Sequence, residues 1–351
     1  MKILLVTDAW HPQVNGVVRT LEEVTRRLAA AGHEVKLVAP SQFFSLPMPS
    51  YPEIRLAFAG SRTLGRIIDG FRPDQIHIAT EGPLGFAARK ACIRRQVAFT
   101  TSYHTRFPEY VRARLPVPLS WSYALMRRFH NAGNGCLVAT RSIANELRSH
   151  GFSTVIPWTR GVDHTLFRPR PDDNLADEMG WTRPVFMNVG RLSVEKNMPA
   201  FLDLDLPGTK VVVGDGPLRA QFEDRYRDVV FTGSLTGETL ARHYAAADVF
   251  VFPSLTDTFG NVLLEALACG VPVAAFPVPG PLDVIGGSDA GVLDADLRKA
   301  ALAALEIPRE KALAHSRRFD WDECVRLFVE AGQAVRPKNA RKFGRALRAR
   351  A

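Results

Sequence analysis

The chain has 351 residues, of which 46% are hydrophobic and 23% charged, and only four are cysteines. This length and composition suit a globular protein of one or, more naturally, two domains, and they exclude a disordered, collagen-like or disulfide-stapled chain. The four cysteines are widely scattered and form no C-x-x-C pair, so the sequence indicates neither a zinc site nor a disulfide framework and favours a reducing compartment.

The net charge of +9 is distributed unevenly along the chain. Residues 1–170 carry a net charge of +12, residues 171–335 carry −10, and residues 336–351 carry +7. A uniformly basic protein would suggest a nucleic-acid partner, whereas a basic half beside an acidic half predicts that one domain faces an anionic surface. We see no signal peptide and no apolar run of the roughly 18–20 residues that span a membrane. We therefore expect a cytoplasmic protein, peripheral on the cytosolic face of a membrane.

Strand-like apolar runs alternate with helical patterns, which is typical of parallel sheets covered by helices. In the first half we expect strands near residues 2–7, 34–39, 75–79, 97–101 and 135–139. Between the first two strands, apolar residues recur at helical spacing and predict an amphipathic helix that stops near Gly32. The pattern restarts in the second half, with strands expected near residues 185–190, 210–213, 229–232, 248–252 and 271–275.

A proline-rich segment over residues 157–184 is the expected boundary between the two halves. The predicted architecture is α/β, with a doubly wound Rossmann-like domain over residues 1–165 and a second over residues 166–319, facing each other across a cleft. Ligands of such folds bind at the carboxyl ends of the strands, so we look for functional residues where the strands end.

Three residues of the first half follow predicted strand ends. Gly16 could let a diphosphate approach the backbone closely, or it could be an ordinary turn glycine. No G-x-G-x-x-G follows the first strand, which argues against an NAD or FAD site. His104 could hold a sugar hydroxyl or a departing charge, and Glu81 could orient an acceptor hydroxyl; the alternative for both is a structural role.

In the second half, two cations five positions apart follow a strand that ends in glycine. Arg191 can bind phosphate oxygens through its planar guanidinium group, and Lys196 adds a compact positive charge. The alternative is that both residues belong to a solvated loop. Gly214 lies after the next strand, either in a tight turn or lining the pocket for the donor base or ribose. The pair Asp203 and Asp205 has the D-x-D form of a metal site, but we reject it because no third oxygen ligand is evident.

The segment from Ser254 to Ala266 is the most informative part of the sequence. Asp257 and Glu265 lie eight positions apart, with the turn Gly260-Asn261 between them, directly after an apolar strand. The helix that begins there offers N–H groups and a partial positive charge to phosphate. The two carboxylates beside it can reach hydroxyl groups, so the segment predicts a pocket for a sugar attached to a diphosphate.

These motifs together resemble those of the retaining glycosyltransferases of family 4, which have the GT-B fold. The resemblance covers nearly the whole chain and rests on the N-terminal strand with Gly16, the His104 loop, residues 160–163, the pair Arg191 and Lys196, and the paired acids. The family usually has two glutamates eight positions apart. Asp257 takes the first place here, as in branches that transfer mannose or uronic-type sugars, and this bears on sugar identity rather than on reaction class.

The resemblance implies a role for each matching residue. The catalytic set would be His104, Asp257, Arg191 and Lys196, and the donor-binding set would be Gly16, Gly214, Gly260, Asn261, Val262 and Glu265. Glu265 would bind the ribose hydroxyls and Asp257 the hydroxyls of the sugar. Arg191 and Lys196 would neutralise the diphosphate leaving group of a UDP- or GDP-linked sugar, so no metal and no other cofactor is expected. The product would be an α-glycoside.

The acceptor is expected to be a membrane lipid of the diacylglycerol or ceramide type, bound by the N-terminal domain with Glu81 and Arg106. Residues 110–130 mix aromatic and apolar side chains with cations, a composition typical of an interfacial segment. The expected membrane contacts are Arg112, Arg114, Trp121, Arg127 and Arg128. The apolar loop over residues 43–49 is another candidate for lipid contact. In the family's fold a last helix, here residues 320–335, crosses back to the N-terminal domain and would bring the basic tail 336–351 to the same side.

Three alternatives stay open at this stage. A mannosyltransferase could use a soluble or polysaccharide acceptor. A nucleotide-sugar epimerase of the same fold would also bind the donor in such a cleft. A non-catalytic membrane or nucleic-acid binding protein is a third possibility, although the two cations and two acids argue against it.

Overall fold

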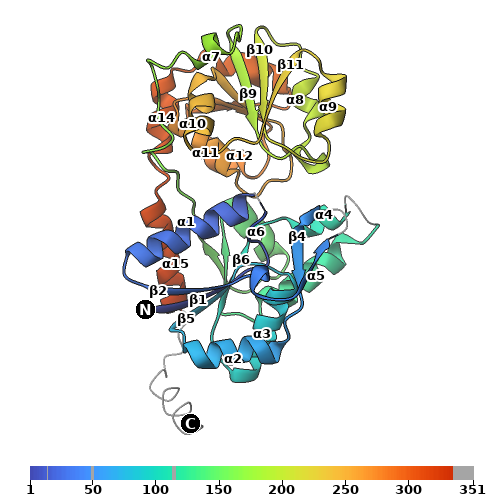
Figure 1. Cartoon of the computed structure of the whole chain (residues 1–351), viewed down its shortest axis with the longest axis vertical. Coiled ribbons are helices and arrows are strands. Elements are labelled where there is room, and N and C mark those ends of the chain that lie inside the picture. The colour runs from blue at the N-terminus through green and yellow to red at the C-terminus, as the bar shows by residue number, and fades with distance from the viewer. Residues whose placement is uncertain (14, 49–50, 113–115, 335–351) are drawn as a thin grey trace. The chain divides into compact units, whose positions relative to one another are not determined.

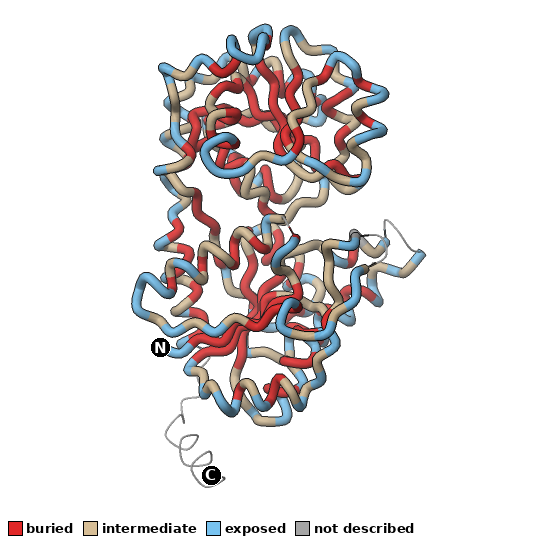
Figure 2. The backbone as a smooth tube through the Cα atoms, in the orientation of Figure 1, coloured by how far each residue is buried: buried red, intermediate tan, exposed pale blue. Residues whose placement is uncertain are grey.

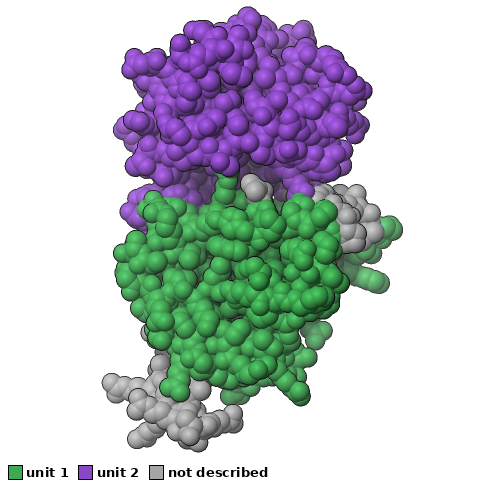
Figure 3. Space-filling view, viewed as in Figure 1, with its two compact units in different colours: residues 1–159, 324–351 green, residues 160–323 purple. Residues whose placement is uncertain are grey.

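The structure is a computed structural model that describes residues 1–13, 15–48, 51–112 and 116–334. It contains two compact α/β units, which are coloured separately in Figure 3. The first unit comprises residues 1–159 together with the chain from Cys324 on, and the second comprises residues 160–323. Helix α15 (Trp321–Ala334) therefore begins in the second unit and contributes most of its length to the first.

The first unit is built on a six-stranded parallel sheet in the order β2-β1-β5-β6-β7-β8 (Figure 1). Its strands are β1 (Lys2–Val6), β2 (Glu34–Val38), β5 (Gln75–Ile78), β6 (Thr100–Tyr103), β7 (Gly135–Val138) and β8 (Val155–Pro157). Two further strands, β3 (Ser45–Met48) and β4 (Tyr51–Ala57), pair antiparallel with each other. The helices are α1 (Gly16–Ala30), η1 (Pro40–Gln42), α2 (Ser61–Phe71), α3 (Pro83–Arg95), α4 (Phe107–Arg112), α5 (Leu119–His130) and α6 (Arg141–Ser149), with α15 added from the chain's end.

The second unit repeats the plan with a parallel sheet in the order β11-β10-β9-β12-β13-β14. Its strands are β9 (Val185–Val189), β10 (Thr209–Val213), β11 (Val229–Gly233), β12 (Val249–Phe252), β13 (Val273–Ala275) and β14 (Gly291–Leu293). Its helices are α7 (Leu175–Glu178), η2 (Val194–Lys196), α8 (Pro199–Leu202), α9 (Arg219–Arg225), α10 (Gly237–Ala246), α11 (Asn261–Ala268), α12 (Pro281–Ile285), α13 (Leu297–Ala304) and α14 (Arg309–Ser316). The predicted α/β class with two doubly wound sheets is confirmed.

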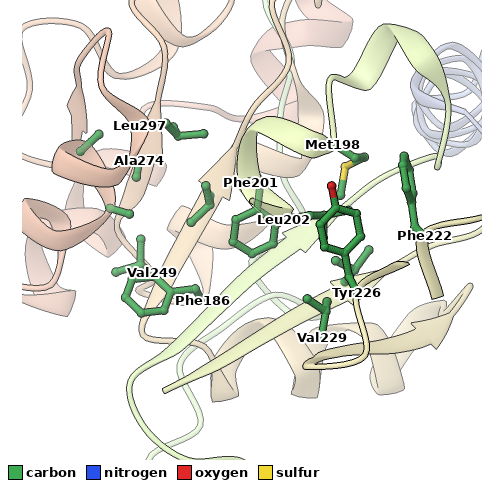
Figure 4. Close-up of a cluster of buried hydrophobic side chains, with 14 of the residues drawn as sticks. Phe186, Met198, Phe201, Leu202, Phe222, Tyr226, Val229, Val249, Ala274 and Leu297 are labelled. Carbon is green, nitrogen blue, oxygen red and sulfur yellow. The ribbon is translucent and has the colours of Figure 1, made fainter. Parts of the chain in front are cut away.

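The central strands of each sheet are buried, and β1, β9 and β12 read as largely apolar runs. Figure 2 shows the central strands of both units in the colour of buried residues. In the second unit, Phe186 of β9 and Val249 of β12 pack with Phe201 of α8 in one apolar cluster (Figure 4). Such packing stabilises the strands, and it leaves the loops at their carboxyl ends to carry the polar residues.

Each sheet has one point where the chain reverses its direction of winding. In the first sheet this point lies between β1 and β5, and in the second between β9 and β12. Loops diverge at such a topological switch point, and doubly wound folds bind their ligands there. The sites are therefore expected in the loops after β1 and β5 in one unit, and after β9 and β12 in the other.

One predicted strand is displaced, and four strands were missed. The strand expected over residues 97–101 is β6 at Thr100–Tyr103, because Val97 instead donates its N–H to Cys92 O and closes the end of α3. Strands β3, β4, β8 and β14 were not predicted. Among the described residues, no helix combines the length and apolar character needed to cross a membrane.

Candidate active site

In the second unit, the loop after β9 is tied to the loop after β12 by two side-chain contacts. Lys196 Nζ lies 2.6 Å from Asp257 Oδ1. The Asn197 amide donates to the carbonyl of Pro253, with 3.1 Å between nitrogen and oxygen. Asn197 has a φ of +53°, a left-handed conformation that asparagine tolerates, and it ends the short helix η2 just after Lys196. Both contacts cross the switch point between β9 and β12.

Buried polar atoms in these two loops lack protein partners. Asp257 Oδ2, Ser193 Oγ and Ser254 Oγ are all inaccessible to solvent, and within the described parts of the chain none of them has a hydrogen-bond partner. Such atoms are rare in native proteins, because each one loses water without gaining a bond. Half-buried Arg191 lies in the same loop as Ser193.

Gly214 is required by packing between the neighbouring loops. A Cβ atom on Gly214 would lie 1.9 Å from Gly190 O, and its φ of +148° also disfavours any other residue. The loop after β10 therefore lies directly on the loop after β9, and Leu192 N donates to Asp215 O at 2.9 Å. This contact accounts for the glycine structurally, and a role for Gly214 in binding the donor stays a prediction.

Helix α11 carries the second acid of the predicted pair. Gly260 precedes it with a φ of +88° and has no side chain to cap the first turn, which begins with Asn261 and Val262. Glu265 lies further along the helix and is only 7% exposed. Its Oε2 accepts a hydrogen bond of 2.8 Å from the hydroxyl of Tyr244, which is itself fully buried on α10. The carboxylate is therefore held in one orientation.

In the first unit, the loop after β1 leads into the N-terminus of α1. Asn15 caps this helix, because its Oδ1 accepts from the N–H groups of Val17 and Val18 at 3.0 Å each. Gly16 is the first residue of the helix and is exposed. Nearby Asp8 accepts from the backbone of the first turn of α3. Burial raises the pKa of Asp8, although those backbone N–H groups lower it in part.

Glu81, in the loop after β5, is paired with a buried histidine. Its Oε1 lies 3.0 Å from His130 Nε2, and His130 Nδ1 lies 2.8 Å from Thr101 Oγ1. Burial opposes the charged form of His130, but Cys136 and Glu81 raise its pKa to about 10. The contact with His130 fixes the orientation of the Glu81 carboxyl group. A role for Glu81 in orienting an acceptor hydroxyl stays a prediction.

His104, just after β6, belongs to a chain of hydrogen-bonding groups. Its Nε2 lies 2.9 Å from Ser102 Oγ, which lies 3.0 Å from Nε2 of the fully buried His77. His77 Nδ1 lies 2.8 Å from Thr100 Oγ1. The His104 ring also contacts Trp158 edge to face, with 5.8 Å between centroids. Ser102 on β6 therefore orients the His104 ring, and His77 on β5 in turn orients Ser102.

Arg106 is engaged in a cluster with two carboxylates. Its Nη2 donates to both oxygens of Glu146 at 2.8 and 3.0 Å and lies 3.6 Å from Glu109. The Tyr123 hydroxyl contacts both of these carboxylates. Burial lowers the pKa of Arg106, but Glu146 more than offsets this and the net shift is upward. The cluster anchors the segment after His104, and an acceptor contact by Arg106 stays a prediction.

Four of the residues predicted to contact a membrane lie on α4 and α5. Arg112, Trp121, Arg127 and Arg128 are exposed, and Trp121 is 72% exposed. Three apolar residues of the same segment, Tyr123, Met126 and Phe129, are buried in the core of the unit instead. Arg114 and the tail 336–351 lie outside the described residues.

The structure gathers most of the predicted residues at the carboxyl edges of the two sheets. Gly16, Glu81 and His104 follow the adjacent strands β1, β5 and β6, while Arg191, Lys196, Gly214 and Asp257 follow β9, β10 and β12. Sequence reasoning missed Tyr244, Ser193, Ser254, Ser102 and His77. A hydroxyl two positions before His104 at the end of a strand was the one signal that could have indicated Ser102.

Comparisons with known proteins agree with this geometry. Residues 14–166 match the model of Glycosyltransferase Family 4, and residues 183–307 match that of Glycosyl transferases group 1. A GDP-mannose-dependent alpha-mannosyltransferase of Mycobacterium tuberculosis is 30% identical over 84% of this chain and 83% of its own. An alpha-monoglucosyldiacylglycerol synthase of Streptococcus pneumoniae is 28% identical over 87% of this chain and 78% of its own. The solved structure of sucrose-phosphate synthase from Thermosynechococcus elongatus has the same fold, with a TM-score of 0.76 at 19% identity over 98% of this chain and 99% of its own.

Proposed function

The chain belongs to glycosyltransferase family 4, and from this premise we propose that it transfers a hexose from a nucleoside-diphosphate sugar to a hydroxyl group with retention of configuration. The observation that carries the proposal is the contact of Lys196 with Asp257 across the switch point of the second sheet. In this contact a cation lies beside the acid that we assign to the sugar. Relatives named GDP-mannose-dependent alpha-mannosyltransferases make GDP-mannose the first donor to test.

Different groups of the second unit would bind the two ends of the donor. Glu265, oriented by Tyr244, would accept from the ribose hydroxyls, and Asp257 would accept from the hydroxyls of the sugar. Arg191 and Lys196 would hold the diphosphate, assisted by the N–H groups of the first turn of α11. Negative charge grows on this diphosphate as the glycosidic bond breaks, so groups that bind it more tightly at that point accelerate the reaction.

We propose that the transfer needs no metal ion, because Arg191 and Lys196 supply the positive charge that a divalent cation would otherwise bring. The test measures release of GDP or UDP from a panel of nucleotide sugars, with a lipid extract as acceptor. GDP-mannose is expected to turn over, and an excess of EDTA is expected to leave the rate unchanged. Loss of turnover in EDTA with recovery on adding Mg²⁺ or Mn²⁺ would contradict the metal-independent part. Turnover of the sugar nucleotide without acceptor or nucleotide release would favour an epimerase.

For the acceptor we propose a membrane lipid bearing a free hydroxyl, such as diacylglycerol, with the enzyme peripheral on the cytosolic face. Exposed Trp121 and Leu125 lie on α5 beside exposed Arg127 and Arg128, which is the composition of an interfacial helix. Near strands β3 and β4, Phe44 and Phe58 are also exposed, and their ring centroids are 5.9 Å apart. The basic charge of residues 1–170 adds attraction toward anionic lipid.

Reversing the charge of Arg127 and Arg128 together is expected to weaken binding to anionic vesicles about tenfold or more, since each cation near such a surface contributes about 1 kcal/mol. The measurement is co-sedimentation with anionic and with neutral vesicles over a series of salt concentrations. The matched control reverses Arg225 and Arg227, two exposed arginines of the second unit. Equal losses in both double variants, or equally weak binding of the unmodified protein to both vesicle types, would contradict membrane contact through α5.

A further inference from the structure

The backbone pairing between β9 and β12 ends earlier than the two strands themselves. The last paired residues are Met187 and Phe250, whereas β9 continues to Val189 and β12 to Phe252. The switch point of the second sheet lies between these two strands. A buried carbonyl of β12 beyond the last pair needs a donor from elsewhere, because an unpaired one is costly.

Two asparagine side chains supply such donors. The amide of Asn188, on β9, donates to Val251 O, with 2.9 Å between nitrogen and oxygen. The amide of Asn197, in the loop after β9, donates to Pro253 O at 3.1 Å. A carbonyl oxygen can only accept, so the NH₂ side of each amide must face it, and the orientation of both side chains is fixed. Val251 and Pro253 are both buried.

These two bonds form successive rungs of an asparagine ladder, Asn188 and Asn197, that extends the pairing of β9 with β12. Pro253 has no N–H group, so the backbone could not have continued a complete ladder through this residue. Lys196 precedes Asn197 directly, and its partner Asp257 lies four residues after Pro253. The asparagine ladder therefore holds the loop after β12 beside the loop after β9, close to where the lysine meets the aspartate.

The loop that carries Asp257 is also confined by the loop after β13. A Cβ atom on Gly280 would lie 2.9 Å from Asp257 O and 3.3 Å from Phe259 O. Gly280 has a φ of +93°, so its conformation favours glycine as much as the lack of space does. Asp257 is thus held between two neighbouring loops, and the Asn197 bond fixes the side that faces Lys196.

We propose that Asn188 and Asn197 are positioning residues that fix the distance between Lys196 and Asp257. The consequence for catalysis rests on the proposed function, in which these two groups bind the diphosphate and the sugar. Asn197 offers the cleaner variant, because its φ of +53° is one that glycine adopts freely. Asn197→Gly therefore removes the amide without straining the backbone.

The geometry is measured without reference to activity, by crystal structures of the unmodified protein and of Asn197→Gly. The contact of 2.6 Å between Lys196 Nζ and Asp257 Oδ1 is expected in the unmodified protein. In Asn197→Gly it is expected to open beyond about 4 Å, the limit of an ion pair. A contact that is absent from the unmodified protein, or that persists in Asn197→Gly, would overturn the proposal, whether or not the protein transfers a sugar.

Kinetics then test the positioning role. Asn197→Gly is expected to lower kcat roughly 10- to 100-fold, because a misplacement of about 1 Å can have an effect of that order. In a Lys196→Ala enzyme the same change is expected to lower kcat by a further factor of about two at most, since the contact that it positions is already lost. A full additional loss in that background, at an unchanged melting temperature, would show that Asn197 acts independently of Lys196 and would overturn the role.

Two further variants complete the test. Asn188→Leu keeps the approximate size of the side chain without its amide and is also expected to lower kcat. Asn131→Gly removes an amide that donates to Gly151 O at 3.0 Å in the first unit, and this matched control should leave kcat unchanged. Unchanged kcat in both variants of the asparagine ladder, or an equal loss in Asn131→Gly, would contradict the role. Absence of transfer by the unmodified protein would instead count against the proposed function.

Discussion

Replacing Lys196 with alanine is expected to lower kcat about 10³-fold, with a much smaller effect on the KM of the donor. The ammonium lies 2.6 Å from Asp257, and we place it at the diphosphate, where negative charge develops in the transition state. Removing one preorganised group of this kind from an active site typically lowers the rate 10²- to 10³-fold, and a formal charge belongs at the upper end. The measurement is steady-state release of the nucleoside diphosphate.

Two further variants separate this effect from a loss of folding. Lys196→Ala leaves Asp257 largely buried without its cation, so Lys196→Ala combined with Asp257→Asn tests whether melting temperature recovers while activity does not. Lys299→Ala breaks a lysine–aspartate pair of 2.8 Å in the same unit, remote from the switch point in sequence, and should leave kcat unchanged. A Lys196→Ala enzyme that kept more than about a tenth of its activity would exclude the charge-neutralising role.

Replacing Glu265 with glutamine is expected to weaken binding of the nucleoside diphosphate about 10- to 100-fold. Hydrogen bonds to a charged group contribute about 1.5–3 kcal/mol each, and bonds to a neutral amide contribute roughly half of that. For two ribose hydroxyls the loss is about 1.5–3 kcal/mol, and every 1.4 kcal/mol corresponds to a factor of ten in affinity. Titration calorimetry with GDP and UDP measures it directly.

Tyr244, the hydrogen-bond partner of Glu265, offers a control variant with a smaller expected effect. Tyr244→Phe removes only the hydroxyl that orients the carboxylate, so it should weaken binding by about 0.5–1.5 kcal/mol. Loss of the 2′-hydroxyl should cost less affinity in the Glu265→Gln protein than in the unmodified protein, because the acceptor of that hydroxyl is already weakened. If the deoxy form loses equal affinity against both proteins, Glu265 does not contact the 2′-hydroxyl.

The strands that could be predicted are those that form the centre of each sheet. Residues 3–6 and 249–252 are apolar throughout, because helices cover both faces of a parallel strand, and such runs are visible locally. The missed strands carry weaker patterns. Strand β3 contains Pro47 and is only partly buried, and β14 is three residues long and half-buried. Their pairing depends on neighbours far along the chain, which no local pattern records.

The residues of the candidate site also fall into those that the sequence could predict and those that it could not. Asp257 and Lys196 were found because polar residues directly after an apolar strand indicate a ligand at the carboxyl edge of a sheet. Tyr244 was missed because it lies on the apolar face of α10 and looks like a core residue until its hydroxyl is seen to meet Glu265. His77 was missed because it lies inside a buried strand, and its partner Ser102 belongs to the next strand.

Helix α15 has a consequence for the order in which the two units can fold. The Trp158 indole donates to the carbonyl of Cys324 at 3.0 Å, and the Phe328 ring contacts both Trp158 and His77. Trp158 and α15 are separated by about half of the chain, so a nascent polypeptide cannot complete its first unit until α15 has been translated. The second unit, whose residues are contiguous, is free to assemble earlier.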